Sequence, residues 1–86
     1  MNEIIFSSAF QRQLKKISKQ NFRLKSKIRK ILNLLLADLN NPTLKLHKLS
    51  GENNWSVSVT LDIRIVLHWE KDRIFLLRIG GHDEVY

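Results

Sequence analysis

The chain has 86 residues, 43% of them hydrophobic and 27% charged, with a formal net charge of +7 and no cysteine. These values predict one globular domain over residues 1–86 with a modest core, and they exclude a disulfide framework and a metal site built on thiolates. No unbroken apolar run is longer than the four residues at 34–37, which is far too short to span a bilayer. Because the lack of cysteine also fits a reducing compartment, we expect a cytoplasmic protein with no membrane partner.

The charge is unevenly distributed along the chain. Residues 1–37 hold nine Lys or Arg residues and one acid, a net charge of +8, whereas residues 38–86 hold six bases and seven acids, a net charge of −1. Such an asymmetry indicates an anionic partner, either a nucleic acid or an acidic protein. The alternative is a solvated helix face that only aids solubility, although the excess of one sign is larger than solubility needs.

The first half of the chain predicts a short strand followed by two helices. Residues 4–6 are β-prone, and the Ser-Ser pair after them can cap a first helix. A second helix is expected from about residue 22 to residue 39, and the Asn-Asn-Pro segment at 40–42 stops it because proline cannot continue a helix. The apolar residues recur at helical spacing, at Phe10, Leu14 and Ile17 and then at Leu24, Ile28, Ile31 or Leu32, Leu35 and Leu39.

The second half predicts strands. The expected strands are residues 44–49, 55–61, 63–69 and 74–79. Residues 70–73 are polar and predict a hairpin, while the last strand is apolar at nearly every position, which is typical of a central strand. It is expected to run into a Gly-Gly turn at 80–81. The order β-α-α-β-β-β-β predicts an α+β fold in which both helices cover one face of a small, mainly antiparallel, twisted sheet.

Strand alternation places a set of polar side chains on the sheet face opposite the helices. The set consists of Ser56, Ser58, Thr60, Arg64 and Arg78, with His82 nearby. Because the arginine fork suits bidentate contact with phosphate, the face resembles a phosphate-binding surface. An ordinary solvated face, with Arg64 paired to Asp62 or Glu70, is equally compatible with the pattern. His68 is expected to be structural, and the three histidines lack the spacing of a zinc site, so we expect no metal.

Three segments resemble toxins of the RelE/ParE superfamily from bacterial toxin–antitoxin pairs. They are the His-Lys-Leu-Ser-Gly segment at 47–51, the strand pair at 55–66 with its Asp-x-Arg motif, and the Ile-Gly-Gly-His-Asp-Glu-Val-Tyr ending at 79–86. Together with the element order, the resemblance covers essentially the whole chain and is closest to the RelE and YafQ branch of mRNA interferases. It implies a RelE-like fold and an endoribonuclease that cuts mRNA, commonly in the ribosomal A site, without a metal or other cofactor.

The resemblance also implies roles for particular residues. The ribose 2′-hydroxyl attacks the adjacent phosphate, a reaction that needs a base, an acid and cations for the developing charge. His82 matches the family's general acid, Arg64 the strand arginine that stabilises the transition state, and Tyr86 the aromatic residue that orients the nucleotide. His47 and Asp62 match YafQ-type active-site positions, with His47 a possible base. The candidate RNA contacts are Lys45, Lys48, Ser56, Ser58 and Arg78.

The chain departs from the family pattern at two serines. Relatives place Lys, Asp or His on the strand before the Asp-x-Arg motif, where this chain has Ser56 and Ser58, and a serine hydroxyl is a poor base. Two alternatives follow: a module of the same fold that binds RNA, the ribosome or an antitoxin without cleavage, and a ParE-like inhibitor of gyrase. The family further implies a cognate antitoxin with an acidic, partly disordered segment, for which the basic N-terminal half offers a docking surface.

Overall fold

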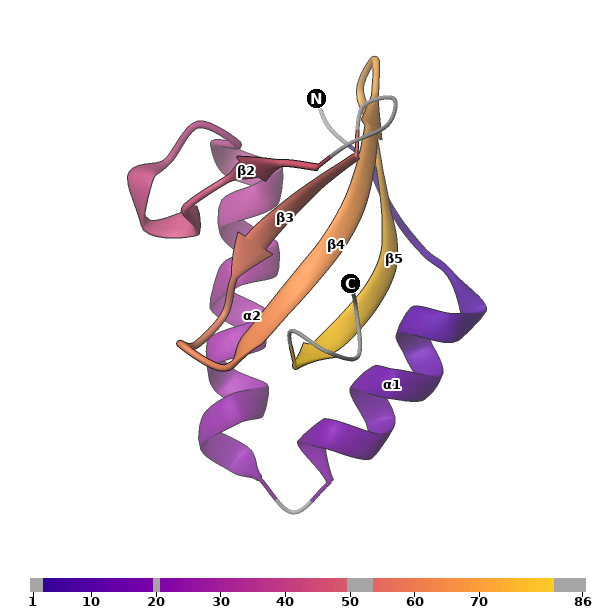
Figure 1. The fold of residues 1–86 in the computed structure, drawn as a ribbon, viewed down its shortest axis with the longest axis vertical. Helices are drawn as coiled ribbons and strands as arrows, with labels where there is room; N and C mark the ends of the chain where they lie inside the picture. Colours follow the sequence, from indigo (N-terminus) through magenta and orange to yellow (C-terminus); the bar gives the residue numbers. More distant parts are fainter. Residues whose placement is uncertain (1–2, 20, 50–53, 82–86) are drawn as a thin grey trace.

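The computed structural model describes residues 3–19, 21–49 and 54–81. Its elements are β1 (Glu3–Phe6), α1 (Ser8–Ser18), α2 (Phe22–Ala37), a 3-10 helix η1 (Pro42–Leu44), β2 (His47–Lys48), β3 (Asn54–Ser58), β4 (Ile63–Glu70) and β5 (Arg73–Gly81). The strands form one sheet in the order β1-β5-β4-β3-β2, in which β1 and β5 are parallel and the other pairs antiparallel. Figure 1 shows the strands in front of α2, so the predicted α+β architecture is confirmed.

Side-chain caps set the beginnings of the helices. The Ser7 hydroxyl accepts a hydrogen bond from the Phe10 N–H at 3.0 Å, and the Asn21 amide oxygen accepts one from the Leu24 N–H at 3.1 Å. The second helix ends at Ala37, two residues before its predicted end. None of the helices in the described ranges is long and apolar enough to cross a membrane.

The predicted strand at 44–49 is wrong over its first three residues. Asn41 accepts a hydrogen bond from the Thr43 N–H at 2.9 Å, and Pro42 then occupies the first turn of η1. Lys45 ends this turn with a left-handed backbone (φ 48°). Residues 44–46, which alternation assigned to a strand, therefore belong to a local turn or follow it, and only residues 47–48 pair with β3.

The ends of β3 and β5 also differ from the prediction. β3 stops at Ser58, since the N–H groups of Val59 and Thr60 both donate to the Ile63 carbonyl and close a tight connection to β4. The Gly-Gly pair at 80–81 was expected to turn, yet it continues β5 because β4 supplies partners for it at Arg64 and Ile63. The hairpin predicted at residues 70–73 is confirmed.

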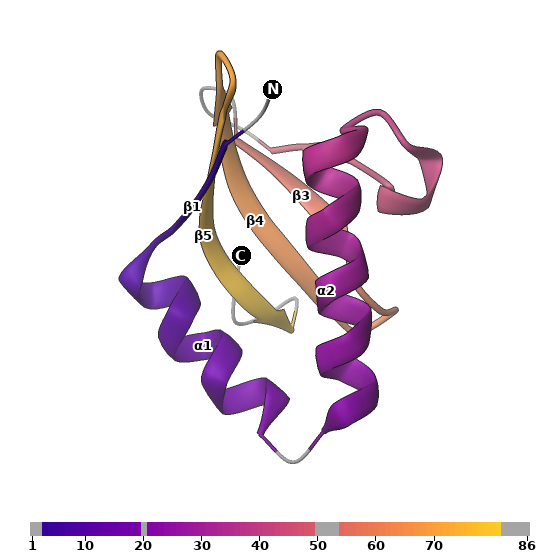
Figure 2. The ribbon, with the colours of Figure 1, turned by 180° about the vertical axis from the view of Figure 1, so that it is seen from behind.

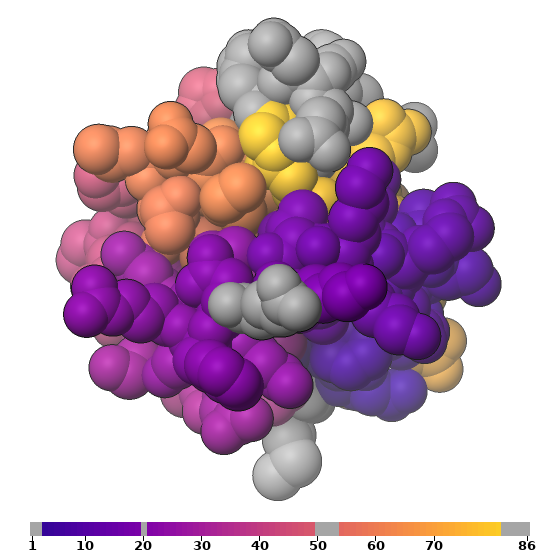
Figure 3. All heavy atoms as spheres, turned by 90° about the horizontal axis from the view of Figure 1, so that it is seen from below, coloured from indigo at the N-terminus to yellow at the C-terminus, as the bar shows by residue number. Residues whose placement is uncertain are grey.

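The core lies between the helices and one face of the sheet. Its buried members include Phe10 from α1, Ile28, Ile31 and Leu35 from α2, and Val57, Ile65, Leu67, Ile74, Leu76 and Ile79 from the sheet. Leu44 of η1 is fully buried as well and closes one end of this core. Figure 2 shows α2 running along the sheet on this side, and Figure 3 shows α1 and α2 packed side by side at the end where their connection lies.

Candidate active site

Four of the polar residues predicted to share the face opposite the helices, Ser56, Ser58, Arg64 and Arg78, do share it. Thr60 lies instead in the connection after β3, and His82 lies outside the described residues. Val57 and Ile65 are buried in the helix-covered core, so the residues that alternate with them point the other way. The register then sets the neighbours on this face: His47 pairs with Ser56, and Ser58 pairs with Arg64. We call the face that these residues share the polar sheet face.

Arg64 is held by a buried serine. The Oγ of Ser56 accepts hydrogen bonds from Nε of Arg64 at 3.2 Å and from Nη2 at 3.0 Å. Ser56 is 0% exposed, and a hydroxyl oxygen has two lone pairs, so both can be used by one guanidinium. A longer contact joins Nη2 to the Lys45 carbonyl at 3.4 Å. Alternation alone predicts that Ser56 contacts RNA, whereas in the structure its hydroxyl holds the Arg64 side chain in place.

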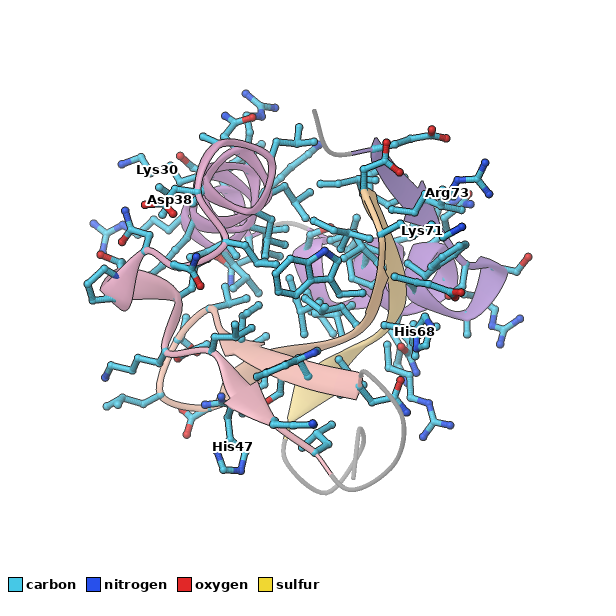
Figure 4. All side chains as sticks on the ribbon, turned by 90° about the horizontal axis from the view of Figure 1, so that it is seen from above. Lys30, Asp38, His47, His68, Lys71 and Arg73 are labelled. Carbon is cyan, nitrogen blue, oxygen red and sulfur yellow. The ribbon has the colours of Figure 1, made fainter. Side chains whose placement is uncertain are left out.

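His47 and Lys48 lie on opposite faces of β2. His47 is exposed and pairs with Ser56, and Figure 4 shows its ring pointing away from the helices. Lys48 pairs with Trp55 instead, and its Nζ lies 5.7 Å from the centroid of the Trp55 ring, within cation–π range. The structure thus brings His47 beside the Ser56–Arg64 contact and does not bring Lys48 there.

The connection between β3 and β4 is fixed by hydroxyl groups. The Ser58 hydroxyl donates to the Thr60 carbonyl at 3.0 Å, and the Thr60 hydroxyl accepts from the N–H groups of Asp62 and Ile63 at 3.1 and 3.0 Å. Ser58 is thus engaged in the connection itself. Asp62 is exposed in this connection, two residues before Arg64.

β5 contributes a second arginine and a glycine to this face. Arg78 is exposed and pairs with Val66, while Gly80 lies opposite Arg64 and adds no side chain. Arg78 is therefore diagonal to Arg64 across the two strands, a separation that long side chains can span. The pairing slips by one residue between Val66 and Leu67, which leaves Leu77 without a counterpart on β4.

His68 has a structural role, as predicted. Its Nδ1 lies 3.0 Å from the Asn54 amide oxygen and its Nε2 lies 3.3 Å from a Glu70 carboxylate oxygen. Its ring also contacts Phe75, with centroids 5.9 Å apart. Both ring nitrogens therefore have partners among the neighbouring side chains.

Two of the predicted catalytic residues, His82 and Tyr86, lie outside the described residues, as do Asp83 and Glu84. Their roles stay predictions. Within residues 3–19, 21–49 and 54–81, no three His, Asp or Glu side chains come together in a way that could hold a metal ion. What the described part of the face offers is a positioned guanidinium, a neighbouring imidazole and a second arginine, a combination suited to a phosphodiester.

Sequence reasoning missed the support for Arg64 and two contacts that tie α1 to β5. The amide oxygen of Gln13 accepts a hydrogen bond from the Ile79 N–H at 3.0 Å, and the Ser7 hydroxyl donates to the Leu77 carbonyl at 3.0 Å. No local pattern announces such contacts, because each joins residues more than 60 positions apart. Only the N-cap signal of Ser7 was visible in the sequence.

Solved structures of bacterial toxins share this fold. A chain of the E. coli DinJ–YafQ complex matches with a TM-score of 0.84 at 18% identity, over 100% of this chain and 99% of that one. The metal-bound toxin from Helicobacter pylori matches with a TM-score of 0.84 at 26% identity over all of both chains. A YoeB/ParE toxin from Agrobacterium tumefaciens matches with a TM-score of 0.78 at 16% identity, over 95% and 99% of the two chains. The chain thus has the fold of the YafQ and RelE/ParE toxins.

The family follows from the sequence comparison. The family model described as the bacterial toxin of type II toxin–antitoxin system, YafQ, matches residues 2–86. The chain belongs to the YafQ family of type II toxins. No curated protein matches it. The resemblance drawn from the 47–51, 55–66 and 79–86 segments is confirmed.

Proposed function

We propose that this toxin is an endoribonuclease that cleaves mRNA in the ribosomal A site at its polar sheet face, and so inhibits translation and growth. The observation that carries the proposal is the Arg64 guanidinium fixed on the Ser56 hydroxyl, with His47 paired to the same serine. Membership of the YafQ family supports the same reading. A phosphate gains negative charge in the transition state, and a cation held in a fixed orientation stabilises that charge.

The chemistry uses a nucleophile that the RNA itself supplies. The 2′-oxygen forms a bond to the adjacent phosphorus, and the bond from phosphorus to the 5′-oxygen of the next nucleotide breaks. His47 takes the proton of the 2′-hydroxyl, His82 donates a proton to the departing 5′-oxygen, and Arg64 offsets the charge on the non-bridging oxygens. An imidazole can act as a base or as an acid near neutral pH, and each transfer is worth ~10²–10⁴-fold. The products are a 2′,3′-cyclic phosphate and a free 5′-hydroxyl.

The remaining candidates have supporting roles in this proposal. Tyr86 orients the scissile nucleotide by stacking, and Arg78 and Lys45 bind neighbouring phosphates. Asp62, two residues before Arg64 in the sequence, helps to orient the groups around the guanidinium. Ser56 acts through Arg64 and does not replace the missing basic or acidic residue of the relatives. The base role therefore belongs to His47.

We also propose a protein partner, an antitoxin whose acidic segment docks between the two helices. Leu14, Ile28 and Leu32 line an apolar hollow of about 470 Å³ between α1 and α2. Cationic side chains surround it at Lys15, Lys25 and Arg29, and residues 4–37 contain no acid. An amphipathic helix with acids beside its apolar stripe matches both features. The E. coli relative was crystallised in complex with DinJ, which supports a partner of this kind.

The nuclease proposal is tested with purified protein and a short mRNA, with and without ribosomes. We expect new 5′-hydroxyl ends and 2′,3′-cyclic phosphates, and we expect ribosomes to be needed. Arg64→Ala should lower the cleavage rate by about 10²–10³-fold, as the loss of one transition-state donor typically does. Arg73→Ala is the control, since it removes the same charge at the far end of β5, away from His47 (Figure 4). RNA that stays intact while it is bound would favour a binding module, and altered DNA supercoiling would favour a gyrase inhibitor.

The antitoxin proposal has its own test. Combining Lys25→Glu with Arg29→Glu should weaken binding of an acidic antitoxin at least tenfold at low salt, and Lys30→Glu, on the outer side of α2 in Figure 4, should change it little. Binding of the unchanged toxin should also weaken as salt rises, because exposed charges are screened beyond about 10 Å at 0.1 M ionic strength. If the Lys25→Glu/Arg29→Glu double variant and Lys30→Glu weaken antitoxin binding equally, the hollow between α1 and α2 is not the docking site.

A further inference from the structure

The outer edge of β5 changes partner halfway along the strand. β1 pairs with β5 only from Arg73 to Leu76, yet β5 continues to Gly81. Beyond Leu76, no strand of the described chain lies beside that edge, and Figure 2 shows α1 descending there directly from β1. The backbone groups of β5 that face this edge still need hydrogen-bond partners.

Ser7, the N-cap of α1, and Gln13 within α1 supply those partners. The Ser7 N–H and hydroxyl donate to the carbonyls of Leu76 and Leu77, each at 3.0 Å, and the Gln13 amide oxygen accepts from the Ile79 N–H at 3.0 Å. The spacing is matched: six helical residues from Ser7 to Gln13 rise about 9 Å, and the two or three strand residues they reach span roughly 7–10 Å. α1 therefore extends the sheet edge with side chains in place of a strand.

The last anchored residue, Ile79, precedes two glycines. Gly80 pairs with Arg64 and Gly81 with Ile63, so this end of β5 lies beside the residue that carries the guanidinium. Glycine has the greatest backbone freedom of any residue, so the contact of Gln13 with Ile79 adds to the pairing with β4 that holds this end in place. The chain then continues to His82.

We propose that Gln13 is a positioning residue of the active site. By accepting the Ile79 N–H it fixes the end of β5 against β4, and thereby the point from which the chain leads to His82. Its effect on catalysis rests on the proposed ribonuclease function, whereas its effect on β5 does not.

The first arm of the test is amide hydrogen exchange in ¹⁵N-labelled protein. Gln13→Leu removes the acceptor, and the unpaired N–H should make exchange at Ile79, Gly80 and Gly81 at least about tenfold faster. Gln13→Glu keeps an oxygen in place and should stay close to the unchanged protein. Gln11→Leu is the matched control, because the Gln11 side chain donates to the Phe6 carbonyl and does not reach β5. Unchanged exchange in Gln13→Leu, or equal acceleration in Gln11→Leu, would overturn the proposal.

The second arm is RNA cleavage by the same variants. A positioning role predicts that Gln13→Leu lowers kcat about tenfold with KM nearly unchanged, and that Gln13→Glu restores kcat. Faster exchange with unchanged kcat would refute the catalytic role while leaving the anchor of β5 intact. If the unchanged protein cleaves no RNA, the ribonuclease proposal fails, and the exchange arm still decides whether Gln13 fixes β5.

Discussion

Replacing Ser56 with alanine removes the oxygen that accepts two of the hydrogen bonds from Arg64. Ser56 is 0% exposed, and its Oγ lies 3.2 Å from Nε and 3.0 Å from Nη2 of Arg64. A hydrogen bond to a charged group contributes about 1.5–3 kcal/mol. Because the arginine is only half-buried, water replaces part of that interaction, and we expect the free energy of unfolding to fall by ~1–2 kcal/mol.

Urea denaturation of four proteins measures this effect: the unchanged chain, Ser56→Ala, Arg64→Ala and the double variant. If the serine acts through the arginine, the two changes are not additive, and their interaction energy should be at least ~0.5 kcal/mol. Ser58→Ala is the control, because that hydroxyl donates to the Thr60 carbonyl and not to Arg64. A Ser56→Ala cost that is the same with and without Arg64 would refute the support role.

Three further outcomes are expected. His82→Ala should let cells grow when the toxin is expressed alone, whereas arrest like that of the unchanged toxin would remove His82 from the mechanism. Leu44→Ala should lower the free energy of unfolding by about 2–5 kcal/mol because Leu44 is fully buried. Leu61→Ala should change it by no more than ~0.5 kcal/mol because Leu61 is 96% exposed. Thermal or urea unfolding measures both changes, and equal costs would contradict the described core. Lys71→Gly should stabilise the hairpin by ~0.5 kcal/mol, because glycine removes the steric strain of the left-handed backbone at Lys71 (φ 55°) and this gain exceeds the entropic cost of ordering a glycine. A clear loss of stability would show that the lysine side chain stabilises the hairpin.

The sequence predicted the sheet faces well because burial of one face imposes a period of two. Trp55 and Val57 on β3, and Ile63 and Ile65 on β4, pack toward the core as their alternation indicated. The Gly-Gly pair was predicted wrongly because its composition favours a turn, whereas the partners on β4 keep it in the sheet. Pairing with a neighbouring strand here overrides local preference.

The site was predictable in its residues but not in its contacts. Alternation put Ser56 and Arg64 on one face, yet it could not show that the hydroxyl lies under the guanidinium. That contact depends on the register of β3 and β4, which the short connection at residues 59–62 sets through the Thr60 hydroxyl. The same limit explains Lys48: only the pairing with Trp55 reveals that it faces away from Arg64.

The most direct test of the central claim is to map the 5′ ends of mRNA in cells that express the toxin without an antitoxin. The unchanged toxin should produce new 5′-hydroxyl ends inside coding regions within minutes of induction, and Arg64→Ala should produce almost none at equal protein level. The same ends in the Arg64→Ala strain, or growth arrest by the unchanged toxin without any new ends, would contradict cleavage at the polar sheet face.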